Sequence, residues 1–544
     1  MKRKNFTSLD GFWSLSVKNG KTVTKIGEIR VPFAPESILS EIHKSFKKGD
    51  TLVYETQLPP IDPSPTERVF LYFGAVDCLA RVYVNGTELG THAGGYLPFS
   101  FELTPPLAAE NILTVEVKDT LSPLYPYGKQ RKRRGGMWYT PISGIWQSVF
   151  LEITPENPIT ALKITPTADS VTIETRGGES EKTITLKDGT TYPYTGDFIT
   201  LTPEHPHLWS PDDPYLYEFT LSDGKDEIES YFALRSFQTR TVNGKPTLLL
   251  NDKPIFCHGI LDQGYFPDGI YTPASPEAYT DDVRLVKSLG FNMIRKHIKI
   301  EPDSFYYDCD RLGVLVFQDL VNSGKYSFIR DTALPTVGIK RGIRQTATKE
   351  RAEIFEASAK DTLAHLYNHP SIVAYTIFNE GWGQYDADRL YNLCKGADPT
   401  RLYDTTSGWF WEHDSDFQSE HVYFKKLALK PWGTKPLFLS EFGGYSYNVE
   451  GHTFNLDKTY GYRKFTDQAA FEDAFVALYE TEVIPAVKDG LCATVYTQLS
   501  DVEDETNGLV TYDRRVVKVT PERVRAMSEK LLAAFEESLN TAKG

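Results

Sequence analysis

The sequence predicts two β-sandwich domains followed by a (β/α)8 barrel. The length of 544 residues is too great for one ordinary domain. Up to about residue 237, short alternating apolar runs are separated by turn residues, whereas from 238 onward strand-like runs alternate with helical stretches. We therefore expect the domains to cover residues 1–155, 156–237 and 238–544.

The first two domains are predicted to be all-β. Runs such as "RVFLYFGAVD" and "NILTVEVKD" alternate apolar and polar residues, and Asn85-Gly86 is a favoured hairpin dipeptide. Residues 156–237 continue with short strands such as "VTIETRG" and "LYEFTLSDG", with turns every eight to twelve residues. This spacing is typical of an immunoglobulin-like sandwich.

The C-terminal part is predicted to be a single barrel. The strand-like runs "FNMIRKHI", "VLVFQDL", "SIVAYTIFNE" and "PLFLSEFGG" are separated by longer stretches, among them the helical "ATKERAEIFEASAKDTLAHL". Alternation of this kind over about 300 residues favours one (β/α)8 barrel.

Composition excludes several classes of partner. A net charge of −14 argues against nucleic acid, and no apolar run reaches the roughly 20 residues of a membrane span. The N-terminus has no apolar stretch of a secretory signal, so we expect a cytoplasmic protein.

Five scattered cysteines give no disulfide framework and no zinc motif, and we expect no cofactor and no metal. The oligomeric state stays open, a homo-oligomer included.

Two charged runs have a plain interpretation. The basic run "KQRKRR" at 129–134 is interpreted as a solvated loop, although aromatic residues follow it directly. The acidic set near residue 503 lacks the spacing of an EF-hand, so we expect a solvated rim and not a calcium site. Its members are Asp501, Glu503, Asp504 and Glu505.

Two glutamates carry the chemical signal. Glu380 follows a buried strand-like run, and Glu441 follows the run "LFL". Residues at the carboxyl ends of barrel strands face the active site, so both carboxyls should enter one cleft. Cleavage of a glycosidic bond needs one protonated and one ionised carboxyl. The structural alternative pairs each glutamate with Arg or Lys, but the neutral Asn379 beside Glu380 suits a contact to a sugar hydroxyl.

The chain resembles glycoside hydrolase family 2, which contains β-galactosidases, β-glucuronidases and β-mannosidases. The resemblance rests on "VYVNGTELGTHAGGYLPFSFEL", "GGMWYTPISGIWQSVFLE", "HLWSPDDPYLY", "FNEGWG" and "LSEFGG" and covers nearly the whole length. It implies a jelly-roll sugar-binding domain, an immunoglobulin-like domain and a catalytic TIM barrel. It also implies that Glu380 is the acid/base and Glu441 the nucleophile of a retaining enzyme.

Further residues are candidates for substrate binding. Arg295 either holds the nucleophile ionised or forms a core ion pair, and the short spacing leaves the role of His297 open. Trp382 is a candidate stacking platform, and the resemblance implies that Tyr423 touches the nucleophile. The remaining candidates follow the first and eighth barrel strands, where the resemblance implies substrate contacts and a structural role is the alternative: His258, Asp262, Gln263 and Gln498. Asp319 ends the third strand and is expected to orient its neighbours.

The sugar is less well defined by the sequence. Glucuronidases of the family carry an Asn-x-Lys motif, whereas here Asn507 is followed by Gly508 and Leu509. We therefore expect an exo-acting β-galactosidase, with a β-glucuronide or other uronide, a β-mannoside or an arabinoside as alternatives. The basic run 129–134 keeps an acidic sugar or leaving group in consideration if its loop covers the barrel mouth. A carbohydrate-binding relative without catalysis and a metal-dependent lyase are the competing classes.

Overall fold

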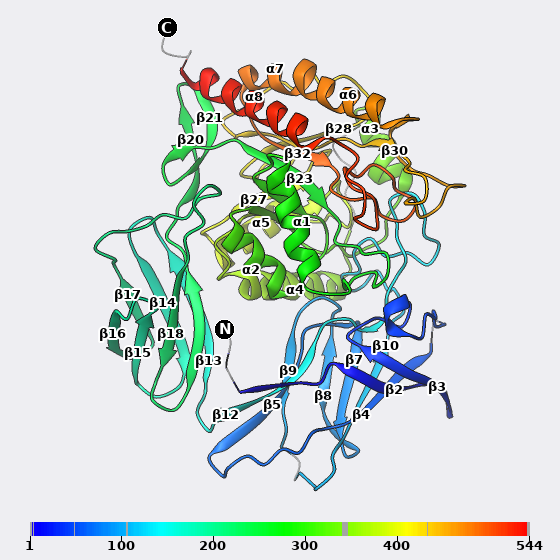
Figure 1. Cartoon of the computed structure of the whole chain (residues 1–544), viewed down its shortest axis with the longest axis vertical. Helices are drawn as coiled ribbons and strands as arrows, with labels where there is room; N and C mark the ends of the chain where they lie inside the picture. Colours follow the sequence, from blue (N-terminus) through cyan, green and yellow to red (C-terminus); the bar gives the residue numbers. More distant parts are fainter. Residues whose placement is uncertain are drawn as a thin grey trace.

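The computed structural model shows three hydrophobic cores: one among the N-terminal strands, one in a second set of strands, and one centred on the C-terminal barrel. The structure describes residues 3, 5–47, 49–104, 107–339, 346–431 and 433–540. In Figure 1 the barrel and its helices occupy the upper part, with the N-terminal strands below it and a second set of strands to the left. The predicted order of two β-sandwiches and a barrel is therefore confirmed.

The N-terminal part contains a four-stranded and a six-stranded sheet, joined by a two-stranded pair. Asn85 and Gly86 both have positive φ, 51° and 78°, and link β7 to β8 with Val84 opposite Thr87, as the predicted hairpin requires. The strands are β1 (Phe6–Ser8), β2 (Gly11–Asn19), β3 (Thr22–Val31), β4 (Thr51–Gln57), β5 (Glu67–Phe73), β6 (Val76–Asp77), β7 (Leu79–Val84), β8 (Thr87–Ala93), β9 (Phe99–Glu102), β10 (Ile112–Lys118), β11 (Gly144–Ile145) and β12 (Val149–Pro155).

The second part is a smaller sandwich of a three-stranded and a four-stranded sheet, followed by a three-stranded sheet that leads into the barrel. Alternating burial, as in β14 and β15, places one face of each strand in the shared core. The strands are β13 (Ile159–Pro166), β14 (Val171–Gly177), β15 (Glu181–Leu186), β16 (Thr191–Thr195), β17 (Phe198–Leu201), β18 (Tyr217–Ser222), β19 (Glu227–Phe232), β20 (Phe237–Val242), β21 (Lys245–Leu250) and β22 (Lys253–Pro254).

The barrel is an eight-stranded parallel sheet whose outer strands, β27 and β28, lie next to each other and nearly close it. All eight residues of β26 are buried, as predicted for a strand covered on both faces. The strands are β23 (Cys257–Asp262), β24 (Met293–Lys296), β25 (Leu315–Asp319), β26 (Ile372–Asn379), β27 (Leu402–Ser407), β28 (Gln418–Val422), β29 (Leu437–Gly443) and β32 (Leu491–Thr497). A parallel pair, β30 (Tyr445–Tyr447) and β31 (Arg463–Phe465), lies in the loop after β29.

Helices follow most barrel strands, but the described residues between β27 and β28 and between β28 and β29 contain none. The α-helices are α1 (Glu277–Ser288), α2 (Asp303–Leu312), α3 (Leu334–Thr336), α4 (Lys349–Leu366), α5 (Ala387–Ala397), α6 (Gln468–Leu478), α7 (Ile484–Ala486) and α8 (Pro521–Asn540). Short turns of other helix types are η1 (Ile38–Ser40), η2 (Ile329–Ala333), η3 (Tyr479–Val483) and η4 (Val487–Asp489). Among the described residues, none of these helices has the length and apolar character needed to span a membrane.

A segment of the N-terminal domain, residues 127–140, reaches the barrel loops on two sides and is called the crossing segment here. On one side the Tyr127 hydroxyl donates to the Gly324 carbonyl at 2.7 Å. On the other side the Thr140 amide donates to Glu503 at 2.9 Å, and Tyr139 donates to Glu505. The aromatic rings of this segment belong to the barrel core, so the two domains share packing as well as hydrogen bonds.

The acidic set after β32 is not the solvated rim that the sequence suggested. Its four carboxylate residues, Asp501, Glu503, Asp504 and Glu505, are at most 5% exposed. Arg134 of the crossing segment lies 3.1 Å from Asp504 and 3.6 Å from Glu503. Asp501 pairs with Lys518 of the same domain at 2.6 Å, whereas the other three acids have partners in the N-terminal domain, hundreds of positions earlier in the chain, which the local sequence does not indicate.

Replacing Tyr139 by Phe tests whether this contact stabilises the protein. The variant leaves Oε2 of the buried Glu505 without its donor, while Oε1 keeps the Asn507 amide, and the loss costs on the order of 1–3 kcal/mol. We expect the Tm to fall by a few degrees in scanning fluorimetry. Tyr215→Phe is the matched control, because that ring is 42% exposed and its hydroxyl has no hydrogen bond among the described residues. An unchanged Tm in Tyr139→Phe would contradict the expectation.

Candidate active site

Glu380 and Glu441 lie together at the carboxyl ends of the barrel strands. Glu380 directly follows β26 and Glu441 lies near the end of β29, and each residue is 5% exposed. His421 of β28 places Nδ1 2.9 Å from Glu380 Oε1 and 3.6 Å from Glu441 Oε2. One oxygen of each glutamate and one nitrogen of His421 all lie within 4.8 Å of one another. The chain therefore folds so that both carboxyls face one small region.

The turn that presents Glu380 is backbone-strained. Glu380 has φ of 49°, in the left-handed region that side-chain-bearing residues rarely adopt. The next residue, Gly381, has φ of 71°, and a Cβ there would lie 2.5 Å from the Phe410 ring. Strained backbone of this kind persists where the surrounding structure enforces it, and it concentrates at functional sites.

Arg295, which is fully buried, joins the nucleophile candidate to its neighbours. Its guanidinium donates to both oxygens of Asp319, at 2.9 and 3.2 Å. It also donates to Glu441 Oε1 at 3.2 Å, to the Ser440 carbonyl at 3.0 Å and to Asn379 Oδ1 at 2.9 Å. Both roles considered for Arg295, an ion pair in the core and a contact to Glu441, are thus present in one side chain.

Tyr423, directly after β28, makes the second contact to Glu441. Its hydroxyl donates to Glu441 Oε2 at 2.5 Å and lies 2.8 Å from Thr497 Oγ1. Its ring stacks on Tyr462, with ring centres 4.1 Å apart. Glu441 therefore has one oxygen facing a cation and the other facing a hydroxyl donor.

The surroundings separate the proton affinities of the two glutamates. Burial and then the negative charge of Glu441 raise the pKa of Glu380 well above its usual range. Burial also raises the pKa of Glu441, but the charge of Arg295 and the hydrogen bond from Tyr423 act against that rise. Glu441 is therefore the carboxyl that ionises first, and Glu380 retains its proton to higher pH.

Asn379 and His297 lie beside this pair. The Asn379 carbonyl oxygen is occupied by Arg295, while its amide nitrogen has no partner among the described residues. His297 Nδ1 lies 2.6 Å from Asp319 Oδ2. Burial, with the nearby charge of Lys129, lowers the pKa of His297 to about 3, so its ring is neutral near pH 7. Contacts of both residues to substrate stay predictions.

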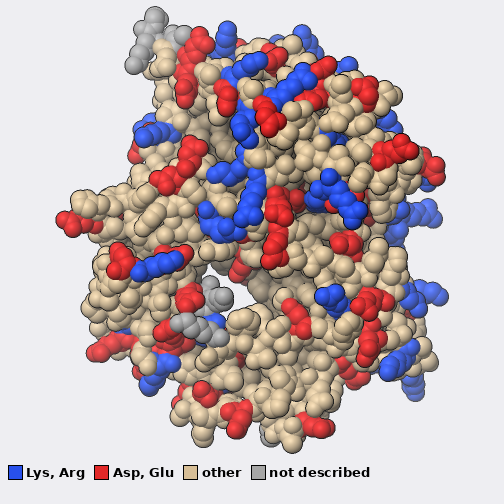
Figure 2. All heavy atoms as spheres, in the orientation of Figure 1, with Lys and Arg blue, Asp and Glu red and all other residues tan. Residues whose placement is uncertain are grey.

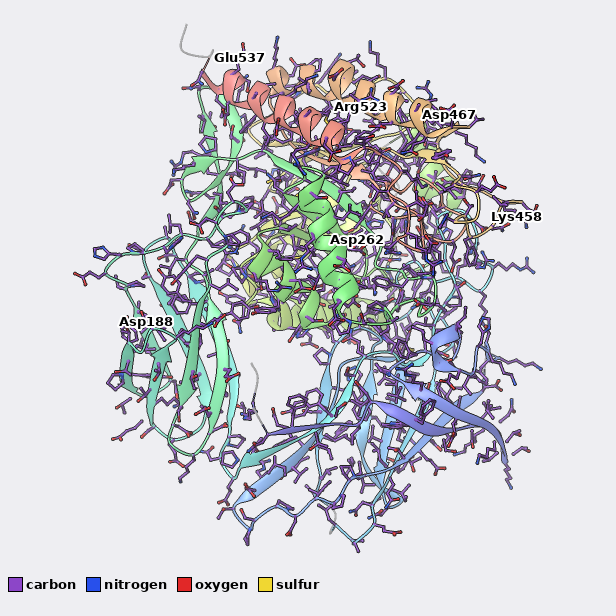
Figure 3. All side chains as sticks on the ribbon, viewed as in Figure 1. Asp188, Asp262, Lys458, Asp467, Arg523 and Glu537 are labelled. Carbon is purple, nitrogen blue, oxygen red and sulfur yellow. The ribbon has the colours of Figure 1, made fainter. Side chains whose placement is uncertain are left out.

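The other candidates from the sequence are held in internal networks. Asp262, labelled in Figure 3, accepts from Lys296 at 2.8 Å and from the Gly264 amide at 2.9 Å. The Gln498 amide accepts from Gln263 at 2.7 Å and donates to Asn507 at 2.8 Å. Their polar atoms are engaged with protein groups, and a role as substrate contacts stays a prediction for both.

The position expected for His258 is wrong. His258 is the second residue of β23, so it lies near the start of the strand and not after it. Its Nε2 lies 3.1 Å from the Tyr479 hydroxyl, and burial lowers its pKa to about 3. The strand runs from Cys257 to Asp262, so it ends four residues after His258 and not before it.

Trp382 lies in an aromatic cluster that crosses the domain boundary. Its ring stacks on Trp138 of the crossing segment with centres 5.2 Å apart, and Tyr326 meets it edge-on at 5.4 Å. Only 1% of Trp382 is exposed, so at least one ring face is covered by protein. Its role as a stacking platform for sugar stays a prediction.

Two residues of the site were missed from the sequence. His421 precedes Tyr423 by two positions, and the strand period of two could have indicated that both side chains face the same side. Lys129 is 6% exposed, and its charge acts on Glu380, Glu441 and His297. Only the long-range fold brings Lys129 to the barrel, although the basic run that contains it was noted.

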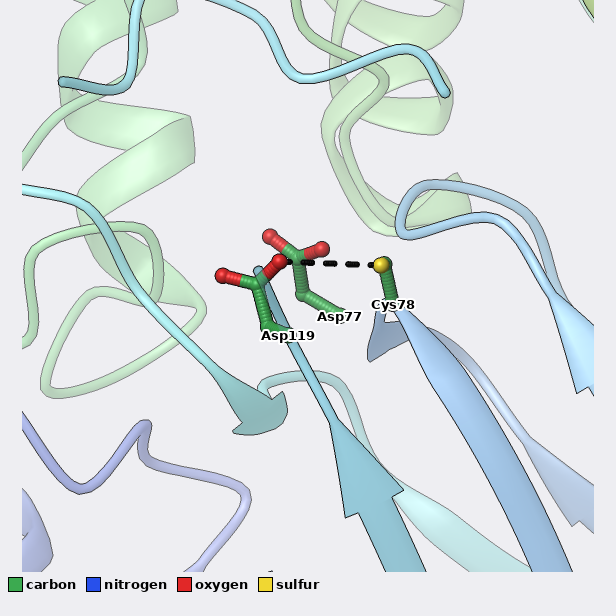
Figure 4. A group of neighbouring side chains, drawn as sticks. All are labelled: Asp77, Cys78 and Asp119. Atoms are coloured by element: carbon green, nitrogen blue, oxygen red, sulfur yellow. Dashed lines mark hydrogen bonds between the residues drawn. The ribbon is translucent and has the colours of Figure 1, made fainter. Parts of the chain in front are cut away.

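Two groups of side chains among the described residues have the spacing of metal ligands. The first is the Glu380, His421 and Glu441 group, and the second is Asp77, Cys78 and Asp119 in the N-terminal domain. Figure 4 shows the second group, in which the Cys78 thiol is directed toward Asp119. The Asp77 carboxylate of this group also accepts from the Gln130 amide at 2.9 Å. Asp77 therefore helps to fix the crossing segment next to Lys129.

Comparisons with known proteins give the family of the chain. A family model described as "Glycosyl hydrolases family 2, TIM barrel domain" matches residues 242–520, and one described as "Glycosyl hydrolases family 2" matches residues 155–235. A β-glucuronidase of Streptococcus agalactiae is 25% identical over 526 residues, covering 84% of this chain and 86% of that protein. A β-galactosidase of Thermoanaerobacter pseudethanolicus is 25% identical over 428 residues, covering 72% of this chain and 53%, about half, of that protein.

Solved structures share the fold over nearly the whole length. The β-D-glucuronidase of Dictyoglomus thermophilum superposes with a TM-score of 0.75 at 18% identity, covering 98% of both chains. A GH2 β-galacturonidase from Eisenbergiella tayi, bound to galacturonate, gives a TM-score of 0.71 at 19% identity, covering 97% of this chain and 98% of that one. At these identities the likeness concerns the fold alone.

A near-closed parallel barrel with two carboxyls of unequal proton affinity at its strand ends is the arrangement that a glycoside hydrolase needs. The family model for the barrel covers more than half of the chain. The chain belongs to glycoside hydrolase family 2.

Replacing Glu380 by Gln should stabilise the protein increasingly as the pH rises. The raised pKa of Glu380 means that the folded state holds a proton that the unfolded state loses above about pH 4.3. Stability of the wild type therefore falls as pH rises toward the folded pKa, and the amide removes this loss. We expect the Tm difference between variant and wild type to grow from pH 5 to pH 8.

The control for this experiment is Glu350→Gln, at an exposed glutamate in the first turn of α4. Its Tm difference from wild type should show no comparable growth with pH. A constant difference for Glu380→Gln over the same range would contradict the raised proton affinity of Glu380.

Proposed function

We propose that the protein is a retaining, exo-acting β-glycosidase, with Glu441 as nucleophile and Glu380 as general acid/base. The observation that carries the proposal is the close pair of carboxyls in unequal surroundings. One oxygen of each carboxyl lies within 4.8 Å of an oxygen of the other, and this close approach is compatible with the roughly 5–5.5 Å spacing of a retaining pair.

In the first step, Glu441 attacks the anomeric carbon while Glu380 gives its proton to the leaving oxygen. The C–O bond to the leaving group breaks, and a covalent glycosyl–Glu441 ester forms. In the second step, Glu380 takes a proton from water, whose oxygen attacks the anomeric carbon and releases Glu441. Each step transfers one proton through Glu380, so the residue ends the cycle as it began.

The surroundings of Glu380 support this change of role. The negative charge of Glu441 is one cause of its raised pKa. That charge is absent while Glu441 is esterified, so the pKa of Glu380 falls and its carboxylate becomes available as a base. His421, at 2.9 Å from Glu380, holds the carboxyl in place through both steps.

Exo action is supported by the crossing segment. It contacts the loops after β25 and β32, and its Trp138 ring stacks on Trp382 beside Glu380, so it borders the region of the two glutamates. A segment packed at this edge of the site leaves less room for a long polymer chain than for a terminal sugar. Among neutral sugars, a β-galactoside remains the prediction from the sequence. The relatives named above include both a β-galactosidase and a β-glucuronidase.

Azide rescue distinguishes the two glutamates. In Glu380→Ala, an activated dinitrophenyl glycoside should still form the intermediate, because its leaving group needs little protonation, whereas an alkyl glycoside should lose about 10²–10⁴-fold in rate. Azide needs no base, so it should release the stalled sugar as the β-glycosyl azide. In Glu441→Ala, azide enters the vacated face and should give the α-azide, and without azide turnover should be absent.

NMR of the azide products reads the anomeric configuration directly. The α-product from Glu380→Ala, or an equal rate loss for all leaving groups, would mean that the two roles are misassigned. Ordinary turnover by sequence-verified Glu441→Gln would exclude Glu441 as nucleophile altogether.

Tyr423→Phe should lower kcat/KM by about 10²–10³-fold, because it removes a preorganised donor to the nucleophile. The same change removes an interaction that opposes the raised pKa of Glu441. The acid limb of the pH–rate profile should therefore move to higher pH, since ionisation of Glu441 becomes harder. Tyr215→Phe again serves as control, and a variant with both the rate and the acid limb of the wild type would refute the role of Tyr423.

A further inference from the structure

Lys129 is a buried cation near the catalytic pair, and its ammonium is in direct contact with no carboxylate among the described residues. The residue is 6% exposed, and its ammonium has no hydrogen bond or ion pair among the described residues. Its described neighbours are two aromatic rings, those of Tyr139 at 5.5 Å and Trp382 at 5.7 Å. A desolvated ammonium without an anion is unfavourable, so the contacts that it makes in this state are incomplete.

The position of Lys129 is fixed by its neighbours in the chain. The Gln130 amide nitrogen donates to Asp77 at 2.9 Å and to the Tyr96 hydroxyl at 3.1 Å, and its oxygen accepts from the Ile142 amide at 2.7 Å. The Lys129 carbonyl accepts from the Tyr139 amide at 3.0 Å. The backbone that carries the ammonium is thus held on both sides, as a binding group requires.

The ammonium lies 5.7 Å from the ring of Trp382, two residues after Glu380. Its charge acts on Glu380 and on Glu441 as well as on His297. The substrate ring next to the scissile bond must lie between the acid and the nucleophile. A cation beside Trp382, whose charge reaches both carboxyls, is therefore near that ring.

A second basic feature continues outward from the site. A hollow of about 790 Å³ is bordered by residues 132–136 and by residues of the loop 455–464, and Lys132, Arg133 and Lys458 have no ion pair there among the described residues. Lys458 lies at the right-hand margin of the barrel in Figure 3. Tyr460 borders the hollow and packs against Tyr462, which stacks on Tyr423 at the nucleophile.

This local excess of positive charge contrasts with the rest of the molecule. The net charge of the chain is −14, and acidic and basic side chains are interspersed over the face shown in Figure 2. A cation in the site and a basic hollow beside it favour an anionic ligand by complementarity. A neutral sugar would leave the Lys129 ammonium without a directly contacting anion in the bound complex.

We propose that the glycone is a hexuronic acid, whose carboxylate is bound by the ammonium of Lys129. The inference rests on the proposed glycosidase function and gives that function its substrate class. Lys129 acts here as a specificity residue from the N-terminal domain, and the barrel glutamates carry out the bond cleavage.

The test compares nitrophenyl β-glycosides that differ only at C6. For the wild type, kcat/KM should be higher for the β-galacturonide or the β-glucuronide than for the neutral sugar of the same configuration. In Lys129→Met, the ratio of uronide to neutral kcat/KM should fall by about 30-fold or more, as expected for loss of one partner of a buried charge pair. Lys129→Arg, which keeps the charge, should retain more of that ratio than Lys129→Met.

If Lys129 acts only through its charge on Glu380 and Glu441, the result is different. Both substrates would then slow in parallel in Lys129→Met, and an unchanged ratio would overturn the proposal. Lys21→Met, at an exposed turn of the same domain, should leave the ratio as in the wild type. The acid limb of the pH–rate profile with the neutral substrate reports separately on any effect of Lys129 on Glu441.

Two further outcomes separate the inference from the proposed function. If the wild type cleaves neutral glycosides but prefers them to both uronides, the inference fails while the glycosidase function stands. If Lys129→Met lowers kcat/KM for a neutral glycoside whose leaving group carries a carboxylate, and not for the uronides, Lys129 binds the leaving group. The assignment to the glycone is then overturned. A wild type that cleaves no β-glycoside of the panel would contradict the proposed function itself.

Discussion

The site depends on the buried guanidinium of Arg295. Its donors reach Asp319 at the end of β25, Asn379 at the end of β26 and Glu441 in β29. One rigid, planar group therefore fixes the ends of three strands relative to one another. A charge without solvent is tolerable only where anions and acceptors compensate for lost hydration, and here two carboxylates, an amide oxygen and a carbonyl do so.

The difference between the two glutamates follows from where these donors are directed. Arg295 and Tyr423 both reach Glu441, whereas Glu380 has His421 beside it and the negative charge of Glu441 nearby. If the surroundings of the two carboxyls were equal, either residue could carry the proton, and neither would be fixed as the acid or as the nucleophile. The unequal contacts stabilise charge on one residue and disfavour it on the other, at a cost in stability that the strained backbone at Glu380 increases.

The features that depend on neighbouring residues in the sequence were mostly predicted correctly. Buried strands such as β26, the hairpin at Asn85-Gly86 and the two glutamates at strand ends all follow from periodicity and turn chemistry. What it failed to predict depends on contacts between distant segments. Arg134 and Asp504 are separated by 370 positions, so neither the burial of the acidic set nor the entry of Lys129 into the site has a local signal.

The division between barrel and crossing segment also separates two chemical tasks. Bond cleavage needs carboxyls held to within fractions of an ångström, and the barrel strands with Arg295 provide that rigidity. Discrimination between sugars needs only one or two groups near the ring, and these can come from a loop anchored elsewhere. Because Tyr127 and Tyr139 fix the crossing segment to the loops after β25 and β32, and Gln130 fixes it to its own domain, a change at Lys129 alters the charge that meets the sugar without removing a hydrogen bond from the network around Glu441. Sugar preference can therefore change within such a scaffold while the cleavage chemistry stays the same.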